Sequence, residues 1–424
     1  MSLFVCAPKS SGVCAPDGAM RVVLYGQRDD GHEASAGQSV RTIVARRKIK
    51  PVPRAWDLLS IALSVVAADF GAQRKASPDG WTRELSLQIS VMEPEFWNTQ
   101  AQALAAALAF LTTDRWSLRF VGGGAQPPDV SKPRAMPEEC VTLLSGGLDS
   151  LVGAIDLVSA GRRPVAISHV VRGDAEKQTS FSARLGGISH VQLNHNAIVP
   201  GDSESSQRAR SVIFLAFGAM VATALDAYKD GAAVVLHVCE NGYIAINPPL
   251  TDMRIGSLST RTAHPEFLGR FQDILRSADL KVEVVNPYAT KTKGEMLKEC
   301  RTQDLLRALA AKSTSCGRFQ RFQYTHCGRC VPCQVRRAAF LAWGERDTTK
   351  YVYTKLGRKD GDHAWFDDVR SVAMATASYL GVAGNAWLAR ATSSRYIDDP
   401  APVAAMLQRG LSELKALHDV YGVK

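Results

Sequence analysis

Short apolar runs alternate with helical patterns from residue 138 onward, and this alternation is the clearest structural signal in the chain. The apolar runs cover Cys140–Leu144, Pro164–Val171, Ser189–Leu193, Ala233–Val238 and Lys281–Val285. A helical pattern follows the first run through Ala160, and a long one covers Glu204–Ala227. Continuous apolar strands alternating with helices predict a doubly wound, parallel, five-stranded α/β sheet. Such sheets bind ligands at the carboxyl ends of their strands.

The first 135 residues have a different pattern. Strand-like runs occur at Met20–Tyr25, Val40–Ala45, Leu85–Val91 and Trp116–Val121. Helical patterns occur at Ala55–Phe70 and Trp97–Leu111. This mixture predicts a small α+β domain over residues 1–135. The segment Gly122–Pro137 holds three glycines and four prolines, which is typical of a linker.

The last part of the chain is helical in pattern. After the second domain, predicted over residues 138–348, helical patterns cover Val369–Leu380 and Pro402–His418. We therefore expect a helical C-terminal extension over residues 349–424.

Composition places the chain among globular proteins. Hydrophobic residues make up 46% and charged residues 22% of the sequence, which allows a large buried core. The apolar stretch Ala55–Phe70 contains Asp57 and Asp69 and is too short to span a bilayer. The first twenty residues lack the pattern of a signal peptide, and the nine cysteines are an odd number. We expect a cytoplasmic protein without disulfides and without a membrane partner.

The formal net charge is +10. A basic surface attracts nucleic acid or other polyanions, and net charge alone does not distinguish between them. The charge is dispersed along the chain, so we favour a basic enzyme that holds ATP and pyrophosphate over a dedicated nucleic-acid binder.

An SGGLDS segment lies between the first predicted strand and the first predicted helix of the second domain. It consists of Ser145, Gly146, Gly147, Leu148, Asp149 and Ser150. The glycines let backbone N–H groups approach an anion, the serines offer hydroxyls, and the following helix directs its positive N-terminus to the same point. The Walker A ending is absent. The segment predicts a phosphate-binding loop; the alternative is a glycine-rich start of a helix.

Four cysteines form the pattern C-x10-C-x2-C-x2-C: Cys316, Cys327, Cys330 and Cys333. Two overlapping CxxC turns bring three thiolates to one centre, and a short upstream loop brings the fourth. This spacing favours a tetrahedral structural Zn²⁺ site. An iron–sulfur cluster and a redox-active CxxC pair are the alternatives.

The two motifs together resemble a known family. An SGGxDS loop after an apolar strand resembles the loop of the ATP pyrophosphatase superfamily, and Cys327–Cys333 resembles the CGxCxxC knuckle of QueC, the 7-cyano-7-deazaguanine synthases. Thr292–Glu295 resembles a TKxE motif, Pro265–Phe267 a PEF segment, and Arg210 the arginine of a GRN motif. The resemblance covers about residues 138–348.

The resemblance implies a fold, a reaction and cofactors. The fold is adenine nucleotide alpha hydrolase-like. The activity is that of an AMP-forming carbon–nitrogen ligase, in which ATP activates the carboxylate of 7-carboxy-7-deazaguanine, ammonia gives an amide, and a second ATP leads to the nitrile. Lys293 and Arg210 are expected to neutralise charge on the phosphates. Asp149 and Glu295 are expected to help hold Mg²⁺, although Glu295 also fits a helix N-terminal acid.

Some segments depart from the QueC pattern. Val171–Lys177 replaces a YGQRH-like segment, and Ser259–His264 lacks an aspartate. For a deazapurine substrate, the candidate binding residues are Glu240, Asn241, Arg261 and His264. Glu240 can accept hydrogen bonds from a guanine-like edge, and Arg261 or His264 can meet a carboxylate. Loop capping and solvated charge are the alternatives for these residues.

The length outside the resemblance is similar to that of enlarged QueC-like proteins of bacterial anti-phage islands, of the QatC kind. This similarity implies that an amine on a partner protein, encoded beside the enzyme, replaces ammonia, and that the N-terminal domain docks this partner. QueC-like enzymes often form homodimers. Two other functions stay open: a tRNA- or DNA-modifying adenylating enzyme, and a non-catalytic nucleotide-binding scaffold of a defence complex.

Overall fold

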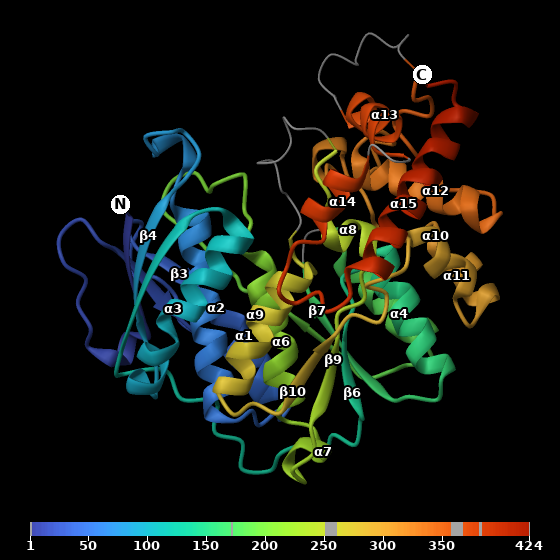
Figure 1. The fold of residues 1–424 in the computed structure, drawn as a ribbon. Helices are drawn as coiled ribbons and strands as arrows, with labels where there is room; N and C mark the ends of the chain where they lie inside the picture. The colour runs from blue at the N-terminus through green and yellow to red at the C-terminus, as the bar shows by residue number, and fades with distance from the viewer. Residues whose placement is uncertain (1, 171–172, 251–260, 358–367, 381–383, 424) are drawn as a thin grey trace.

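The computed structural model describes residues 2–170, 173–250, 261–357, 368–380 and 384–423. Within these residues, two five-stranded sheets lie side by side with helices between them (Figure 1). The first sheet has the order β3-β2-β1-β4-β5 and the second has the order β10-β9-β6-β7-β8. Every pair of neighbouring strands in both sheets is parallel.

The second sheet confirms the predicted doubly wound arrangement. Its strands are β6 (Cys140–Leu143), β7 (Pro164–His169), β8 (His190–Leu193), β9 (Val234–His237) and β10 (Val282–Val285). Helices α6 (Arg210–Ala222) and α9 (Pro265–Ser277) cover one face, and α4 (Leu148–Ser159) and α5 (Ala175–Arg184) cover the other. The strands β6 and β7 read as continuous apolar runs because both of their faces are buried.

The first sheet corrects the predicted α+β organisation. Its strands are β1 (Ser2–Ala7), β2 (Met20–Leu24), β3 (Ala34–Ala36), β4 (Glu84–Ser90) and β5 (Arg115–Val121). Helix α2 (Pro53–Gly71) lies between β3 and β4 in the chain, and α3 (Pro94–Thr112) connects β4 to β5. This N-terminal region is therefore a parallel α/β unit, because helical crossovers join parallel strands.

Two local predictions also differ from the structure. Val40–Ala45, predicted as a strand, lies in helix α1 (Gln38–Arg46), where Val40 and Val44 are buried one helical turn apart. The long helix predicted over Glu204–Ala227 is shorter: α6 begins at Arg210, and the separate short helix α7 (Asp226–Lys229) follows it.

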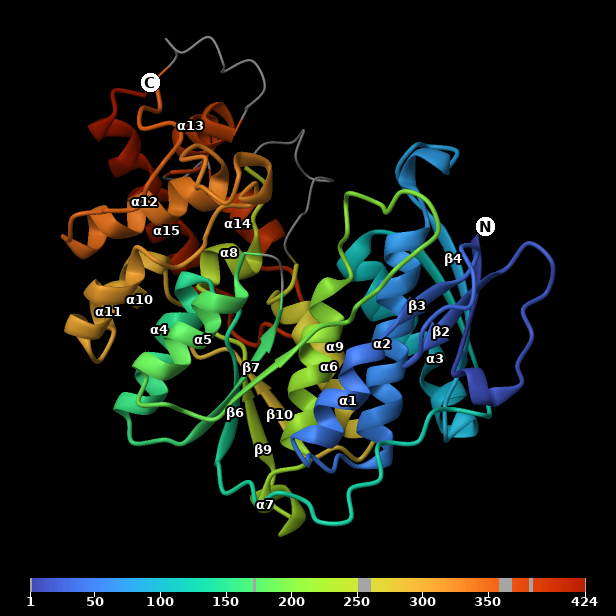
Figure 2. The ribbon, with the colours of Figure 1, turned by 180° about the vertical axis from the view of Figure 1, so that it is seen from behind.

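The helices of the two sheets share one hydrophobic core. Helix α2 packs against α6, and α3 packs against α9, so that four helices form a layer between the sheets (Figure 2). The buried side chains of this core run continuously from the first sheet to the second. The two regions that the sequence separates at residues 135–138 are therefore joined by an apolar interface.

The C-terminal residues are helical, as predicted. Helices α13 (Asp368–Tyr379), α14 (Asn385–Ala391) and α15 (Pro400–Val420) pack over α8 (Gly242–Ile246) and α12 (Val331–Trp343) (Figure 1). Helices α10 (Lys293–Glu299) and α11 (Gln303–Ala310) lie beside α4. Among the described residues, none of the helices has the length and apolar character needed to cross a membrane.

Candidate active site

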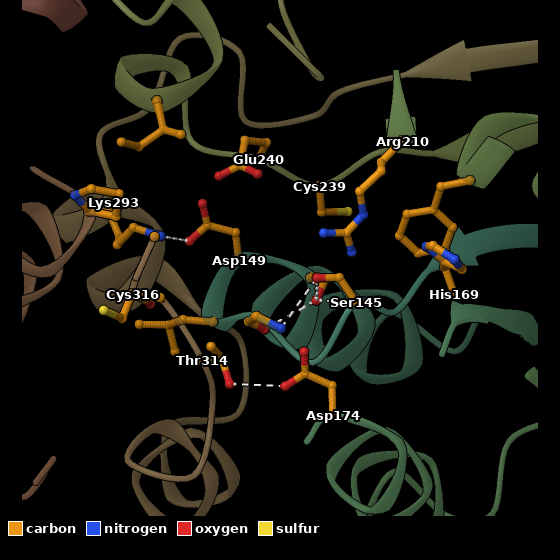
Figure 3. A pocket seen from close by; sticks show the side chains of 18 residues that line it. Ser145, Asp149, His169, Asp174, Arg210, Cys239, Glu240, Lys293, Thr314 and Cys316 are labelled. Atoms are coloured by element: carbon orange, nitrogen blue, oxygen red, sulfur yellow. Dashed lines mark hydrogen bonds and ion pairs between the residues drawn. The ribbon is translucent and has the colours of Figure 1, made fainter. Parts of the chain in front are cut away.

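A cavity of about 350 Å³ lies at the carboxyl ends of the second sheet's strands. Its walls come from the turn after β6, the ends of β7 and β9, the first turns of α6 and α10, and the segment Thr314–Gly317 (Figure 3). This is the edge of a doubly wound sheet at which ligands bind.

The SGGLDS segment forms the loop between β6 and α4. Gly146 has φ +88°, a conformation that favours glycine. The Gly147 N–H donates to Ser145 Oγ at 3.2 Å, and Ser145 Oγ lies 3.0 Å from Ser150 Oγ. Helix α4 begins directly after Gly147. The loop thus directs hydroxyls and the N-terminus of a helix into the cavity, an arrangement suited to phosphate.

Lys293 and Asp149 form a buried ion pair on the cavity wall (Figure 3). Asp149 also accepts hydrogen bonds at Oδ2 from the Asn241 backbone N–H at 3.1 Å and from Asn241 Nδ2 at 2.6 Å. Burial by itself raises the pKa of Asp149, but the Lys293 ammonium and these hydrogen bonds hold it below its usual range. Asp149 therefore stays ionised next to the SGGLDS loop.

Glu240 lies in the same wall, just beyond the end of β9. Its carboxyl group is next to that of Asp149 (Figure 3). Burial and the negative charge of Asp149 raise the pKa of Glu240 well above its usual value. A raised pKa favours the protonated form of the Glu240 carboxyl group, and a protonated carboxyl group can donate a hydrogen bond as well as accept one.

Arg210 enters the cavity from the first residue of α6. Its guanidinium points toward the Ser145 side of the cavity (Figure 3), and no carboxylate of the described residues is in ion-pair contact with it. Burial lowers the pKa of Arg210, and Asp174 offsets part of this effect. A guanidinium without an ion-pair partner among the described residues, beside the SGGLDS loop, is suited to binding an anion.

The predicted substrate residues separate into two groups. Glu240 lines the cavity, whereas Asn241 is fully buried behind Asp149, where its side chain also caps α8. Arg261 and His264 lie between α3 and α9. Arg261 donates to the Phe110 carbonyl at 2.6 Å, and His264 caps α9 with its ring 5.1 Å from that of Phe110. The structure therefore does not bring Arg261 and His264 to the cavity.

Other motif residues have clear positions. Glu295 completes a capping box with Thr292 and pairs with Arg409, so it fits the helix N-terminal role. In the two segments that depart from the QueC pattern, residues 171–172 and 259–260 lie outside the described residues.

The cavity also contains residues that were not predicted from the sequence, among them His169 and Thr314. His169 ends β7 and lines the cavity, and its Nε2 has no hydrogen-bond partner among the described residues. Thr314 lines the cavity beside the phosphate-binding loop, where its N–H donates to the Gly146 carbonyl at 2.9 Å. The position of His169 at the end of a parallel strand is a signal that could have identified it.

The four cysteines meet at one point beside the cavity. Their sulfur atoms all lie within 4.8 Å of one another, and all four side chains are buried. The Cys316–Cys330 and Cys327–Cys333 sulfur pairs are both 3.9 Å apart. A tetrahedral zinc with Zn–S bonds of about 2.3 Å requires sulfur separations of about 3.8 Å. The residues therefore fit a single tetrahedral ion better than a cluster that places its thiolates on separate irons.

Comparisons with known proteins agree with these motifs. The family described as "Queuosine biosynthesis protein QueC" matches residues 262–344. The chain is 30% identical over 247 residues to the 7-cyano-7-deazaguanine synthase of Novosphingobium aromaticivorans, covering 50% of this chain and 93% of that protein. It is 27% identical over 250 residues to the 7-cyano-7-deazaguanine synthase of Methanocaldococcus jannaschii, covering 50% of this chain and 99% of that protein. No solved structure matches the chain.

Proposed function

This chain belongs to the QueC family of 7-cyano-7-deazaguanine synthases, and we propose that it uses ATP to adenylate the carboxylate of a 7-carboxy-7-deazaguanine-like base. A carboxylate oxygen attacks the α-phosphorus of ATP and pyrophosphate leaves. An amine then attacks the activated carbonyl carbon, loses a proton, and displaces AMP to give an amide. The observation that carries the proposal is the convergence of the SGGLDS loop, Arg210 and Lys293 on one cavity.

The positions of the cavity residues suggest a role for several of them. The loop and the N-terminus of α4 hold the pyrophosphate part of ATP, and Arg210 and Lys293 stabilise the negative charge that develops as pyrophosphate leaves. Asp149, beside the loop, is the carboxylate we propose for Mg²⁺, which binds carboxylates together with phosphate oxygens. Glu240 contacts the guanine-like edge of the base.

The cysteine site has a structural role in this proposal. Four thiolates fill a tetrahedral zinc and leave no open position for substrate. Cys316 follows Thr314 by two residues, and Thr314 forms a parallel bridge with Gly147 and a hydrogen bond to Gly146. A bound zinc would therefore hold the segment Thr314–Gly317, which supports the SGGLDS loop.

We propose further that the acceptor is larger than ammonia, as in the enlarged anti-phage type of QueC-like protein. Two observations support this. Half of the chain lies outside the match to relatives that are themselves matched almost completely. In addition, a second cavity of about 810 Å³ adjoins the first and shares Asp174, Arg210, Thr314, Cys316 and Gly317 with it. An amine on a partner protein would reach the adenylate through this opening.

ATP–pyrophosphate exchange tests the adenylation step. The enzyme, ATP and labelled pyrophosphate are incubated with 7-carboxy-7-deazaguanine, with the corresponding amide, or with neither. We expect exchange that depends on the carboxylate. A non-catalytic scaffold would bind ATP and give no exchange with any of these compounds. A tRNA- or DNA-modifying enzyme would require nucleic acid, and its binding would weaken steeply with salt.

Intact-mass measurement tests the acceptor. The enzyme, ATP and 7-carboxy-7-deazaguanine are incubated with the protein encoded beside the enzyme, with ammonia in a parallel reaction. A gain equal to the mass of the base minus water on the neighbouring protein supports a protein amine. Formation of the small amide with ammonia, and no mass gain on the protein, contradicts this part of the proposal and leaves adenylation intact.

A further inference from the structure

The segment that connects β8 to α6 is bound along its length by the N-terminal unit. Ser35 and Ile198 exchange two backbone hydrogen bonds of 2.9 Å, and the Gly37 N–H donates to the His195 carbonyl at 2.6 Å. Further along, the Glu204 N–H donates to the Phe70 carbonyl at 2.8 Å. The segment ends at Arg210, the cation that faces the cavity.

Asp69, near the end of α2, caps the start of α6. Its Oδ2 accepts hydrogen bonds from the N–H groups of Arg208 and Ala209, both at 2.8 Å. The residue at the N-cap position of α6 is Ala209, which has no side chain that can cap the helix. The first N–H groups of a helix lack intrahelical partners, and a carboxylate is favourable there. Asp69 therefore fixes the last two residues before α6, whereas a capping side chain at position 209 would bind the N–H groups of the helix's first turn.

Asp69 is itself held by a buried network of charges. Arg83 Nη2 donates to Asp69 Oδ1 at 2.5 Å and to Asp114 Oδ2 at 2.6 Å. Arg74 binds Asp114 through two hydrogen bonds of 2.8 and 3.0 Å, and the Arg74 N–H donates to Glu204 Oε2 at 2.8 Å. Asp69, Asp114, Arg83 and Arg74 are each at most 3% exposed.

The energetics of such a network suggest that it positions its members rather than stabilises the fold. Burying two arginines and two aspartates removes four charges from water, and a buried ion pair is often no more stabilising than a packed apolar pair. What the network does fix is the position of its members. Asp69 binds the backbone just before α6, and Glu204, which accepts from the Arg74 N–H, also accepts from the Ser206 N–H at 2.7 Å.

We propose that Asp69, held by Arg83, Asp114 and Arg74, is a positioning residue that places the start of α6 so that Arg210 reaches the phosphates of ATP. The N-terminal α/β unit is then part of the catalytic apparatus, although it contributes no residue to the lining of the first cavity. This inference rests on the proposed function for its substrate. Its structural basis is the contact between α2 and α6, which lie side by side (Figure 1, Figure 2).

A matched control lies in the same helix. Asp57 is fully buried in α2 and accepts hydrogen bonds from the Met92 and Glu93 N–H groups at the start of α3, an element of the N-terminal unit itself. Asp57→Ala and Asp69→Ala each remove a buried carboxylate that caps a helix. Only Asp69 is connected to Arg210. Asp69→Asn is a milder second variant, because its amide oxygen can still accept the two backbone hydrogen bonds.

The experiment measures kcat/KM for ATP in pyrophosphate exchange, together with the free energy of unfolding. We expect Asp69→Ala to lower kcat/KM by about 10-fold to 100-fold, since small misplacements of a catalytic group have effects of this size. Asp57→Ala should lose a similar free energy of unfolding and keep kcat/KM within about twofold. The kcat/KM of Asp69→Asn should lie between that of wild type and that of Asp69→Ala.

A double-mutant cycle separates positioning from general destabilisation. If Asp69 acts through Arg210, then Asp69→Ala added to Arg210→Met should lower kcat/KM no further than Arg210→Met alone. If the two substitutions instead lower kcat/KM independently, so that their fold-changes multiply in the double variant, the proposal is overturned. Equal losses of kcat/KM in Asp57→Ala and Asp69→Ala would also overturn it.

Calorimetric binding of pyrophosphate gives a readout that does not need the base. Asp69→Ala should weaken this binding to the same extent as Arg210→Met, and Asp57→Ala should leave it unchanged. If wild-type protein shows no exchange with the deazaguanine compounds, the proposed function fails, while the pyrophosphate series still decides the positioning role. Unchanged pyrophosphate binding in Asp69→Ala would overturn it.

Discussion

Glu413 of helix α15 accepts a hydrogen bond from the hydroxyl of Thr292, 121 residues earlier in the chain. Thr292 is the N-cap of α10, and the next residue is Lys293. Arg409, one turn before Glu413, pairs with Glu295 of the same capping box. Helix α15 thus binds the first turn of α10, the helix that carries Lys293 into the cavity.

Glu413 should make stability depend on pH. Burial raises the pKa of Glu413 from its usual value of 4.5 to about 7. A group whose pKa is raised by folding contributes stability that is fully present below its unfolded pKa and is lost as the pH rises through its folded pKa. From pH 4 to pH 8, wild type should therefore lose roughly 2–3 kcal/mol relative to Glu413→Gln. Urea unfolding at a series of pH values measures this difference.

Asp419→Asn is the control for this measurement. Asp419 lies on the exposed side of the same helix and pairs with Lys415, so its removal should leave the pH dependence as in wild type. Parallel pH profiles for wild type and Glu413→Gln would contradict the raised pKa.

Gly146→Ala tests the phosphate-binding loop. A side chain at φ +88° costs about 1–2 kcal/mol of backbone strain. Gly161 has φ +76° in the turn after α4, and a Cβ there would meet no atom within 4 Å. Gly161→Ala should therefore lose a similar free energy of unfolding. Only Gly146→Ala should also weaken pyrophosphate binding, because Gly146 lies in the loop that we propose for phosphate and Gly161 does not. Equal pyrophosphate binding by the two variants would argue against this role of the loop.

Lys293→Met should harm both stability and activity. It leaves the Asp149 carboxylate buried without its cation, at an expected cost of about 3 kcal/mol. It also removes a charge from the transition state, which should lower pyrophosphate exchange by about 100-fold or more. Lys291→Met is the control, since Lys291 forms an exposed pair with Glu299 and should change the unfolding free energy by less than about 1 kcal/mol. Exchange is compared at a temperature at which circular dichroism shows all variants folded.

Metal analysis tests the cysteine site. Purified protein should contain one zinc per chain, and Cys330→Ser should lose the metal, melt at a lower temperature and show reduced pyrophosphate exchange. Cys14→Ser, which changes an exposed cysteine, should match wild type in all three. Iron in place of zinc, or full metal content in Cys330→Ser, would contradict the proposed site.

The second sheet was predictable because short apolar runs mark its strands, and because β6 and β7 are buried on both faces. All five of its strands are apolar runs, and the Cys140–Leu143 strand leads directly into a loop whose composition already indicates phosphate. The elements around the first sheet were harder to predict. Val40, Ile43 and Val44 favour a strand by residue type, but their spacing places the two valines on the buried side of a helix.

The site was predictable where residues adjoin a motif and not where tertiary contacts decide. Arg210 and Lys293 follow helix starts that resemble family motifs, and both line the cavity. Arg261 and His264 also stand near a family-like segment, yet contacts with Phe110 of α3 bind them elsewhere. Since α3 lies about 150 residues earlier in the chain, no local pattern could have revealed this.

The interface of α2 and α3 with α6 and α9 also limits how the chain can be divided. Cutting it near residue 137 would leave two apolar helical faces open to water, including Phe217 on one side and Trp56 on the other. Each half would then tend to aggregate, and we expect neither half of this chain to fold stably when it is expressed alone or fused to another protein. We expect the two sheets to melt together in a single transition.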